Sequence, residues 1–147
     1  MAYLRKEDLD SLDLEKYLDI ARELSIIDER DINRELNKHS IDYSYYNGLL
    51  IFQKAKLEKL ERTFEILKST LKHDKSLEGK SKGAKYTASF LDDFANQDPN
   101  VSEMSLSIVR EQEVYGYLKS MCSVLQHKKD MLVQVSANTR SEIKQYS

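Results

Sequence analysis

A seven-residue repeat of apolar side chains over residues 43–74 constrains this chain more than any other feature. Two lines of positions, the second three residues after the first, keep a coiled-coil register for about four and a half repeats. At 1.5 Å per residue such a helix is about 48 Å long, and its narrow seam requires another helix along it. The lines are Tyr43, Leu50, Leu57, Phe64 and Leu71, and Tyr46, Gln53, Leu60, Leu67 and Asp74.

A second long helix is predicted from residue 100 to about residue 146. Asp98 precedes Pro99, which suits the first helical position, and Asn100 with Glu103 resembles a capping box. The seam of this helix has Met104, Leu118, Leu125 and Leu132 on one line, with Val114, Met121 and Val135 beside it. Two such helices can fold back on each other, so the expected fold is all-α, a long antiparallel, coiled-coil-like helical hairpin.

Short accessory helices are expected at the N-terminus and in the connection. Asp13 can cap a helix that ends near residue 24, and Asp28 or Asp31 can cap the next helical stretch. The apolar face of the first short helix would be Leu14, Tyr17, Leu18, Ala21 and Leu24. We therefore divide the chain into an acidic amphipathic segment, residues 1–38, and a helical hairpin, residues 39–147.

The connection between the long helices changes composition after Lys72. Residues 73–86 contain two glycines, two serines and several lysines, which predicts a flexible basic loop. Thr87 can then cap a short helix that extends to residue 96, giving an accessory helix over 87–96 with its cap included.

Charge is unevenly distributed, although the net charge is only −2. Residues 1–35 hold 6 basic and 11 acidic side chains, whereas residues 36–90 hold 11 basic and 6 acidic ones. The lysines of the middle segment are either a solvated helix surface or a cationic track for a polyanion. The acidic N-terminal helix either covers the hairpin or docks on a basic partner protein.

Several classes of protein are not indicated. The single Cys122 and three scattered histidines predict neither a disulfide nor a zinc site. The sequence contains no glycine-rich phosphate loop and no nucleophile motif, so we expect no enzyme activity and no cofactor. Neither a membrane span nor an apolar leader is apparent, and we expect a cytoplasmic protein with no membrane association.

Oligomerisation is predicted because one hairpin cannot cover all the apolar side chains of two long helices. We expect the chain to form a homo-oligomer of helices. The residues expected to pack within the hairpin or the oligomer are Leu50, Leu57, Leu60, Phe64, Leu67, Leu118, Met121, Leu125 and Leu132.

Two blocks of sequence resemble the recombination mediators of tailed bacteriophages, the UvsY-like family. The first is Ile41-Asp42-Tyr43-Ser44-Tyr45-Tyr46, which leads into Lys54-Ala55-Lys56-Leu57-Glu58-Lys59-Leu60-Glu61. The second lies in the C-terminal helix, in residues 115–118, 126–134 and 137–142.

The resemblance implies a protein of DNA recombination, repair and replication that binds single-stranded DNA as a ring or similar oligomer. Such a mediator hydrolyses no nucleotide, and it helps a RecA-like recombinase displace single-strand-binding protein from DNA in the host cytoplasm. By type, the positions that match the basic residues of the family are Lys54, Lys56, Lys59, Arg62 and Lys68.

The loop adds further candidates for DNA contact. Lys80, Lys82 and Lys85 extend the cationic track, and Tyr86, or Tyr45 and Tyr46, could stack on unpaired bases. Two other functions remain open. The chain could be a structural or scaffolding helical oligomer, or another partner-docking phage protein, that binds no nucleic acid, or it could be a small inhibitor that binds a host protein through its acidic N-terminal helix.

Overall fold

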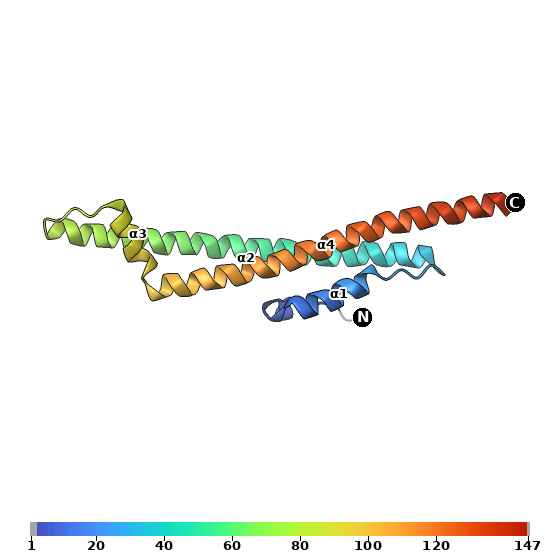
Figure 1. Ribbon diagram of the computed structural model, residues 1–147, viewed down its shortest axis with the longest axis horizontal. Coiled ribbons are helices and arrows are strands. Elements are labelled where there is room, and N and C mark those ends of the chain that lie inside the picture. Colours follow the sequence, from blue (N-terminus) through green and yellow to red (C-terminus); the bar gives the residue numbers. More distant parts are fainter. Residues whose placement is uncertain (1–2, 147) are drawn as a thin grey trace. The chain divides into compact units, whose positions relative to one another are not determined.

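The computed structural model of the chain describes residues 3–146 (Figure 1). Within these residues all regular structure is helical, which confirms the expected all-α class. A short 3-10 helix, η1 (Lys6–Ser11), and α1 (Leu14–Ser25) precede the first long helix, α2 (Ile32–Ser81). The connection contains α3 (Ala88–Asn96), and the second long helix is α4 (Pro99–Tyr146).

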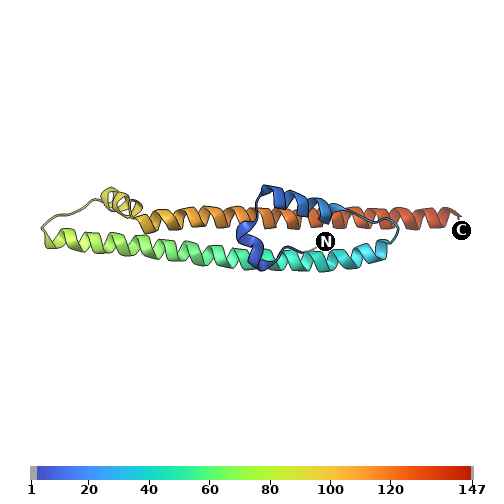
Figure 2. The ribbon, with the colours of Figure 1, turned by 90° about the horizontal axis from the view of Figure 1, so that it is seen from below.

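The chain divides into two compact units. Unit 1 contains the residues up to 53 and those from 114 onward, and unit 2 contains residues 54–113. In each unit, part of α2 lies beside an antiparallel part of α4 (Figure 2). Residue 38, the predicted boundary, lies inside α2, which begins at Ile32, and the N-terminal segment packs within unit 1.

Side-chain caps begin the helices largely where the sequence predicts them. Asp13 accepts a hydrogen bond from the Lys16 N–H at 2.9 Å, and the hydroxyl of Thr87 accepts one from the Phe90 N–H at 3.1 Å. Helix α4 begins at Pro99, which the sequence predicts as its first helical position, and Asp98 caps it by accepting from the Asn100 N–H at 2.9 Å. The predicted capping box starting at Asn100 is therefore wrong, because Pro99 already occupies the first helical position.

Helix α2 continues well past the point where a loop was predicted. Residues 73–81 of the expected 73–86 loop are helical, so that part of the prediction is wrong. The helix ends in a Schellman motif at Gly83, whose φ is 73°. The Gly83 N–H donates to the Lys80 carbonyl at 3.1 Å, and the Ala84 N–H donates to the Gly79 carbonyl at 2.8 Å. Gly79 therefore lies inside the last turn, and of these two glycines Gly83 has the left-handed conformation that stops the helix.

The core of unit 1 joins the N-terminal segment to the two long helices. Leucines from η1, α1 and their flanks pack on Tyr46 and Leu49 of α2 and on one face of α4. Leu14 and Leu18 remain exposed, because α1 turns Leu24, which is buried, and Tyr17 and Ile20, which are half-buried, toward the core. The buried cluster is Leu4, Leu9, Leu12, Leu24, Tyr46, Leu49, Val114, Leu118, Met121, Cys122 and Leu125.

Polar residues occupy several inward positions of unit 1. Glu35 forms an ion pair with Lys128 at 3.4 Å, and Nε2 of His39 lies 2.6 Å from the Leu125 carbonyl oxygen. Asp42 accepts a hydrogen bond from the Tyr3 hydroxyl. The first predicted seam line is consequently displaced by one residue here: Asp42 and Leu49 are buried, whereas Tyr43 and Leu50 are half-buried.

The apolar side chains of unit 2 are less well covered. Its predicted packing residues Leu57, Leu60, Phe64 and Leu67 are all half-buried. By contrast Leu118, Met121, Leu125 and Leu132, in unit 1, are completely buried. Among the described apolar side chains of unit 2, only Ala95, Val101 and Ile108 are buried.

Candidate nucleic-acid interface

One exposed face of α2 in unit 2 carries positive charge and no carboxylate. This face contains Lys59, Arg62 and Lys80. Arg62 is 3 residues after Lys59 and 18 residues before Lys80, and both separations are close to whole numbers of helical turns. The positions between them at the same 3- and 4-residue spacing are apolar, hydroxyl-bearing or histidine. We call this surface the acid-free face, and its exposed residues are Lys59, Arg62, Thr63, Ile66, Ser69, Thr70, His73, Leu77 and Lys80.

The three cations of the acid-free face are available to a ligand. Within residues 3–146 none of Lys59, Arg62 and Lys80 forms an ion pair, and each side chain is exposed. The face extends from Lys59 to Lys80, or over about 32 Å of helix. Exposed Ile66 and Leu77 lie between the charges, so that apolar surface alternates with cationic surface.

Other lysines predicted to bind DNA lie elsewhere on α2. Lys54 and Lys68 share a line with Glu61, because these residues are seven apart, and Glu65 is adjacent to that line. The ammonium of Lys68 also lies 5.3 Å from the centre of the Phe64 ring. This flank therefore has mixed charge, and the predicted track does not form one continuous surface.

Lys56 lies at the helix–helix contact of unit 2 rather than on an open surface. Its Nζ is 3.2 Å from Oε1 of Glu111 on α4, whose side chain is nearly buried. Lys56 lies outside the two predicted seam lines, yet position 56 continues the inward spacing of residues 46, 49 and 53. Removal of Lys56 would leave a carboxylate without this cation.

The turn after α2 carries the remaining predicted cations. Lys82 is 2.9 Å from Glu78, and this contact, together with Lys75, lowers the pKa of the Glu78 carboxyl. Lys72 pairs with Asp92 of α3 and lowers the pKa of that carboxyl as well. Lys80 and Lys85 are exposed and, within the described residues, form no ion pair.

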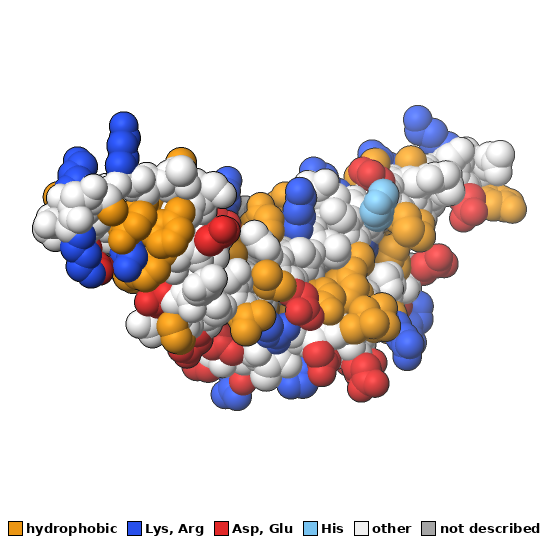
Figure 3. All heavy atoms as spheres, turned by 60° about the vertical axis from the view of Figure 1, so that its left-hand side comes forward, with side chains coloured by type: hydrophobic (Ala, Val, Ile, Leu, Met, Phe, Trp, Pro, Cys, Tyr) orange, Lys and Arg blue, Asp and Glu red, His pale blue; other side chains and the backbone are white. Residues whose placement is uncertain are grey.

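Aromatic rings gather beside this turn in unit 2. Tyr86 stacks on Phe90 with 4.5 Å between ring centres, and the ammonium of Lys75 lies 4.8 Å from the Phe94 ring centre. Gly79 permits this arrangement, since a Cβ there would be 2.5 Å from the Tyr86 ring. Figure 3 shows hydrophobic side chains gathered among lysines and arginines at this end of unit 2. We call Lys75, Gly79, Tyr86, Phe90 and Phe94 the tip cluster.

Tyr45 and Tyr46 have structural roles in unit 1. The Tyr46 ring is completely buried, and its hydroxyl oxygen accepts a hydrogen bond from the Leu4 N–H at 3.3 Å. The Tyr45 hydroxyl donates to the Leu4 carbonyl. Tyr46 therefore cannot stack on a base, and both residues hold the N-terminal segment on α2.

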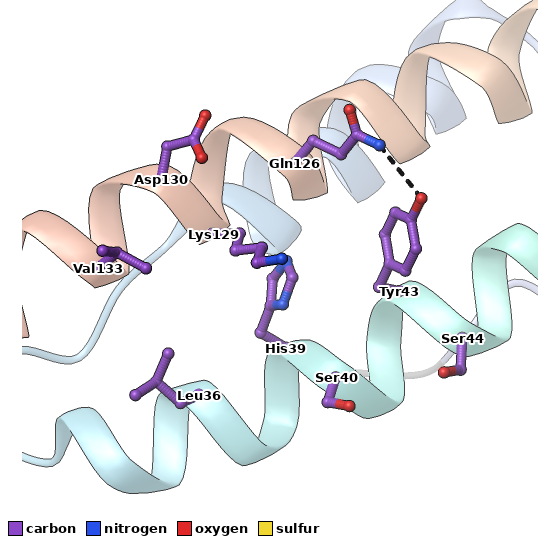
Figure 4. Close-up of a pocket in the computed structure, with 9 residues that line it drawn as sticks. All are labelled: Leu36, His39, Ser40, Tyr43, Ser44, Gln126, Lys129, Asp130 and Val133. Atoms are coloured by element: carbon purple, nitrogen blue, oxygen red, sulfur yellow. Dashed lines mark hydrogen bonds between the residues drawn. The ribbon is translucent and has the colours of Figure 1, made fainter.

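A groove between α2 and α4 in unit 1 is lined by mixed polar and apolar side chains (Figure 4). Gln126 donates a hydrogen bond to the Tyr43 hydroxyl at 3.2 Å across it, and His39 is engaged with the Leu125 carbonyl. Lys129 and Asp130 border the groove from α4. These contacts hold the two helices together, and we assign no ligand to this groove.

Sequence reasoning missed the neutral residues of the acid-free face and the exposed ring of Phe90. The missed face could have been found by plotting acidic residues around the helix instead of counting lysines along it. In residues 3–146, no cluster of His, Cys, Asp or Glu could hold a metal ion, and no helix could span a membrane. No family model, curated protein or solved structure matches this chain.

Proposed function

We propose that this protein binds single-stranded DNA through the acid-free face of α2 and acts as a recombination mediator. The acid-free face is the observation that carries the proposal: three cations, four hydroxyl or imidazole side chains and two apolar ones share one exposed surface. Phosphates pair with lysine and arginine, and a hydroxyl group such as that of Thr70 can donate to a phosphate oxygen. The Thr63 hydroxyl instead donates to the Lys59 carbonyl at 3.0 Å. Contacts of this kind read the backbone, so little base preference is expected.

The electrostatic contribution to DNA binding follows from the number of phosphates that the face neutralises. A protein that neutralises three phosphates of a single strand has a slope of about −2 in a plot of log affinity against log salt. One chain would therefore bind weakly at physiological salt. Assembly of several copies would multiply the contacts and raise the affinity by avidity.

A homo-oligomer is accordingly part of the proposal. Apolar side chains of unit 2 support it, since Leu106 is 72% exposed and the neighbouring Val109 is 58% exposed. Packing of these two side chains against another copy would remove from water apolar surface that unit 2 leaves exposed in one chain.

The mediator role rests on the resemblance to the UvsY-like family. In this role the protein would act without catalysis, in the cytoplasm, by loading a RecA-like recombinase onto DNA covered by single-strand-binding protein. Recombinase filaments should then form faster on covered DNA when this protein is added, and an unchanged rate would leave the protein as a DNA binder alone.

The direct test compares two triple variants for binding to a fluorescent oligothymidylate across a salt series from about 50 mM. The first variant is Lys59→Ala, Arg62→Ala and Lys80→Ala. The control, Lys38→Ala, Lys54→Ala and Lys119→Ala, removes the same charge from exposed positions outside the face. We expect the first to weaken binding and flatten the salt slope, and the control to retain both.

Equal losses in the two variants would contradict the assignment to this face. Absence of salt-sensitive binding by the parent protein would instead favour a scaffolding helical oligomer. That second function is supported by the same exposed pair, Leu106 and Val109, because it requires only helix packing between copies.

A further inference from the structure

Phe90 differs from the other aromatic rings of the tip cluster in its exposure. Tyr86 is half-buried, with Phe90 stacked on it, Gly79 close to its ring and the Lys75 ammonium 5.7 Å from its centre. Phe90 packs on Tyr86 through one face and is still 43% exposed. The ring is thus held by contacts on one side and open to solvent on the other.

The orientation of Phe90 is fixed by its neighbours. The Thr87 cap sets the start of α3, and Phe90 lies three residues later. The Schellman motif at Gly83 sets the direction in which the chain leaves α2, and Tyr86 then fits against Gly79. A ring backed by another ring has few conformations to lose when a ligand covers its open face.

The surroundings favour a nucleobase as the ligand. Lys80, Lys82 and Lys85 lie within ten residues before Phe90, and Lys80 and Lys85 are exposed without an ion pair among the described residues. An apolar surface of a second copy would bury these charges without partners, whereas a nucleic acid would supply phosphates. Asp93, one turn after Phe90, makes the immediate surroundings of the ring unsuited to phosphate itself.

We infer that the open face of Phe90 is a stacking platform for one unpaired base of the bound strand. The inference rests on the proposed function, and it adds a second kind of contact to it: the acid-free face holds phosphates, and Phe90 holds a base. Stacking on a ring accepts any base, which agrees with binding that has little sequence preference.

The test uses the absence of tryptophan from this chain. Phe90→Trp introduces a single indole, whose emission should be quenched when a base stacks on it. Met131→Trp, at an exposed position on α4 in unit 1, is the control and should respond little. Each protein is titrated with oligothymidylate and with an abasic oligonucleotide of the same length, while anisotropy of a label on the oligonucleotide reports binding.

We expect both oligonucleotides to bind, and only the one with bases to quench Trp at position 90. Phe90→Leu keeps an apolar side chain against Tyr86 but removes the flat face, so its affinity for oligothymidylate should fall about 5-fold to about 150-fold. Its affinity for the abasic strand should not change. Circular dichroism checks that both variants keep their helices.

Salt-dependent binding with unchanged emission at position 90 would overturn this inference and leave the proposed function intact. Absence of binding to either strand would overturn both. An emission change that depends on protein concentration, in the absence of DNA, would assign the ring to a contact between copies and so overturn the inference.

Discussion

Lys128 occupies a position at which the heptad pattern of α4 calls for an apolar side chain. Its side chain is 1% exposed, and its Nζ lies 3.4 Å from a carboxylate oxygen of Glu35. The separation is that of an ion pair, although neither atom has hydrogen-bonding geometry. Burial of both charges is costly, and it is compensated only while the two remain together.

Lys128→Met should therefore lower the free energy of unfolding by about 3–5 kcal/mol, because Glu35 would remain buried without a cation. The double variant Lys128→Met with Glu35→Leu should recover most of that loss. Urea denaturation measures both, and Lys129→Met at the neighbouring exposed position is the control. A double variant as unstable as the single one would show that packing, and not charge, decides stability here.

Tyr3 provides a second test at the level of one residue. Its hydroxyl donates to Asp42, and this hydrogen bond raises the pKa of Tyr3 to about 12. The folded pKa lies above the ordinary value of 10.0, so the stabilisation is complete below pH 10 and is lost as pH rises through about 12.

We expect the parent protein to be more stable than Tyr3→Phe below pH 10, and the difference to disappear as pH approaches 12. The two proteins differ only at residue 3, so the comparison isolates Tyr3. Urea denaturation at a series of pH values measures the two stabilities. A difference that stays constant with pH would exclude this hydrogen bond as its cause.

Among the elements, helix α2 shows how differently two glycines can act in one helix. Gly48 has no neighbouring atom within 4 Å of a Cβ position, whereas a Cβ at Gly79 would be 2.5 Å from the Tyr86 ring. The first glycine only weakens the helix. The second makes room for the tip cluster.

Gly48→Ala should raise the free energy of unfolding by about 0.5–1 kcal/mol, because alanine favours the helix and meets no neighbour. Gly79→Ala should lose this gain, since Tyr86 has to leave its place against α2. Thermal denaturation compares the variants. An equal gain in both would mean that the Tyr86 ring moves aside without cost.

Local signals in the sequence were sufficient for the helices and their caps, because Asp13 and Thr87 act on neighbouring backbone groups. The end of α2 was misplaced because composition does not distinguish Gly79 inside the last turn from Gly83 at a positive φ. Inward polar residues such as His39 could not be assigned, since their partners are distant in sequence. For the candidate site, the lysines were evident, but their separation onto different faces depends on helical geometry.

Taken as a whole, the molecule protects its apolar side chains unequally. Unit 1 has a cluster of buried leucines supplied partly by the N-terminal segment, whereas unit 2 leaves its seam half-buried and Leu106 exposed. The oligomer that we propose would form through the exposed apolar side chains of unit 2. Substitutions at the two kinds of site should therefore have different consequences.

Leu106→Asp with Val109→Asp should lower the mass measured by sedimentation while leaving the helical content unchanged, since both positions are exposed in one chain. Leu118→Asp should unfold unit 1, because it buries a charge without a partner. A parent protein that sediments as a monomer would contradict the oligomer. A double variant with the parent's mass would place the interface elsewhere.

The ion pair of Glu35 with Lys128 also bears on the register in which α2 and α4 pack. Leucine side chains allow two helices to pack in several registers, because one leucine can replace another along a seam. A buried charge requires one particular partner and so fixes the register. Reversing the pair, with Glu35→Lys and Lys128→Glu together, would keep the ion pair within one chain. A helix of this variant packed against a helix of the parent would instead bury two like charges together. If the parent and the charge-reversed variant are mixed in one solution, each should fold, and neither should exchange helices with the other.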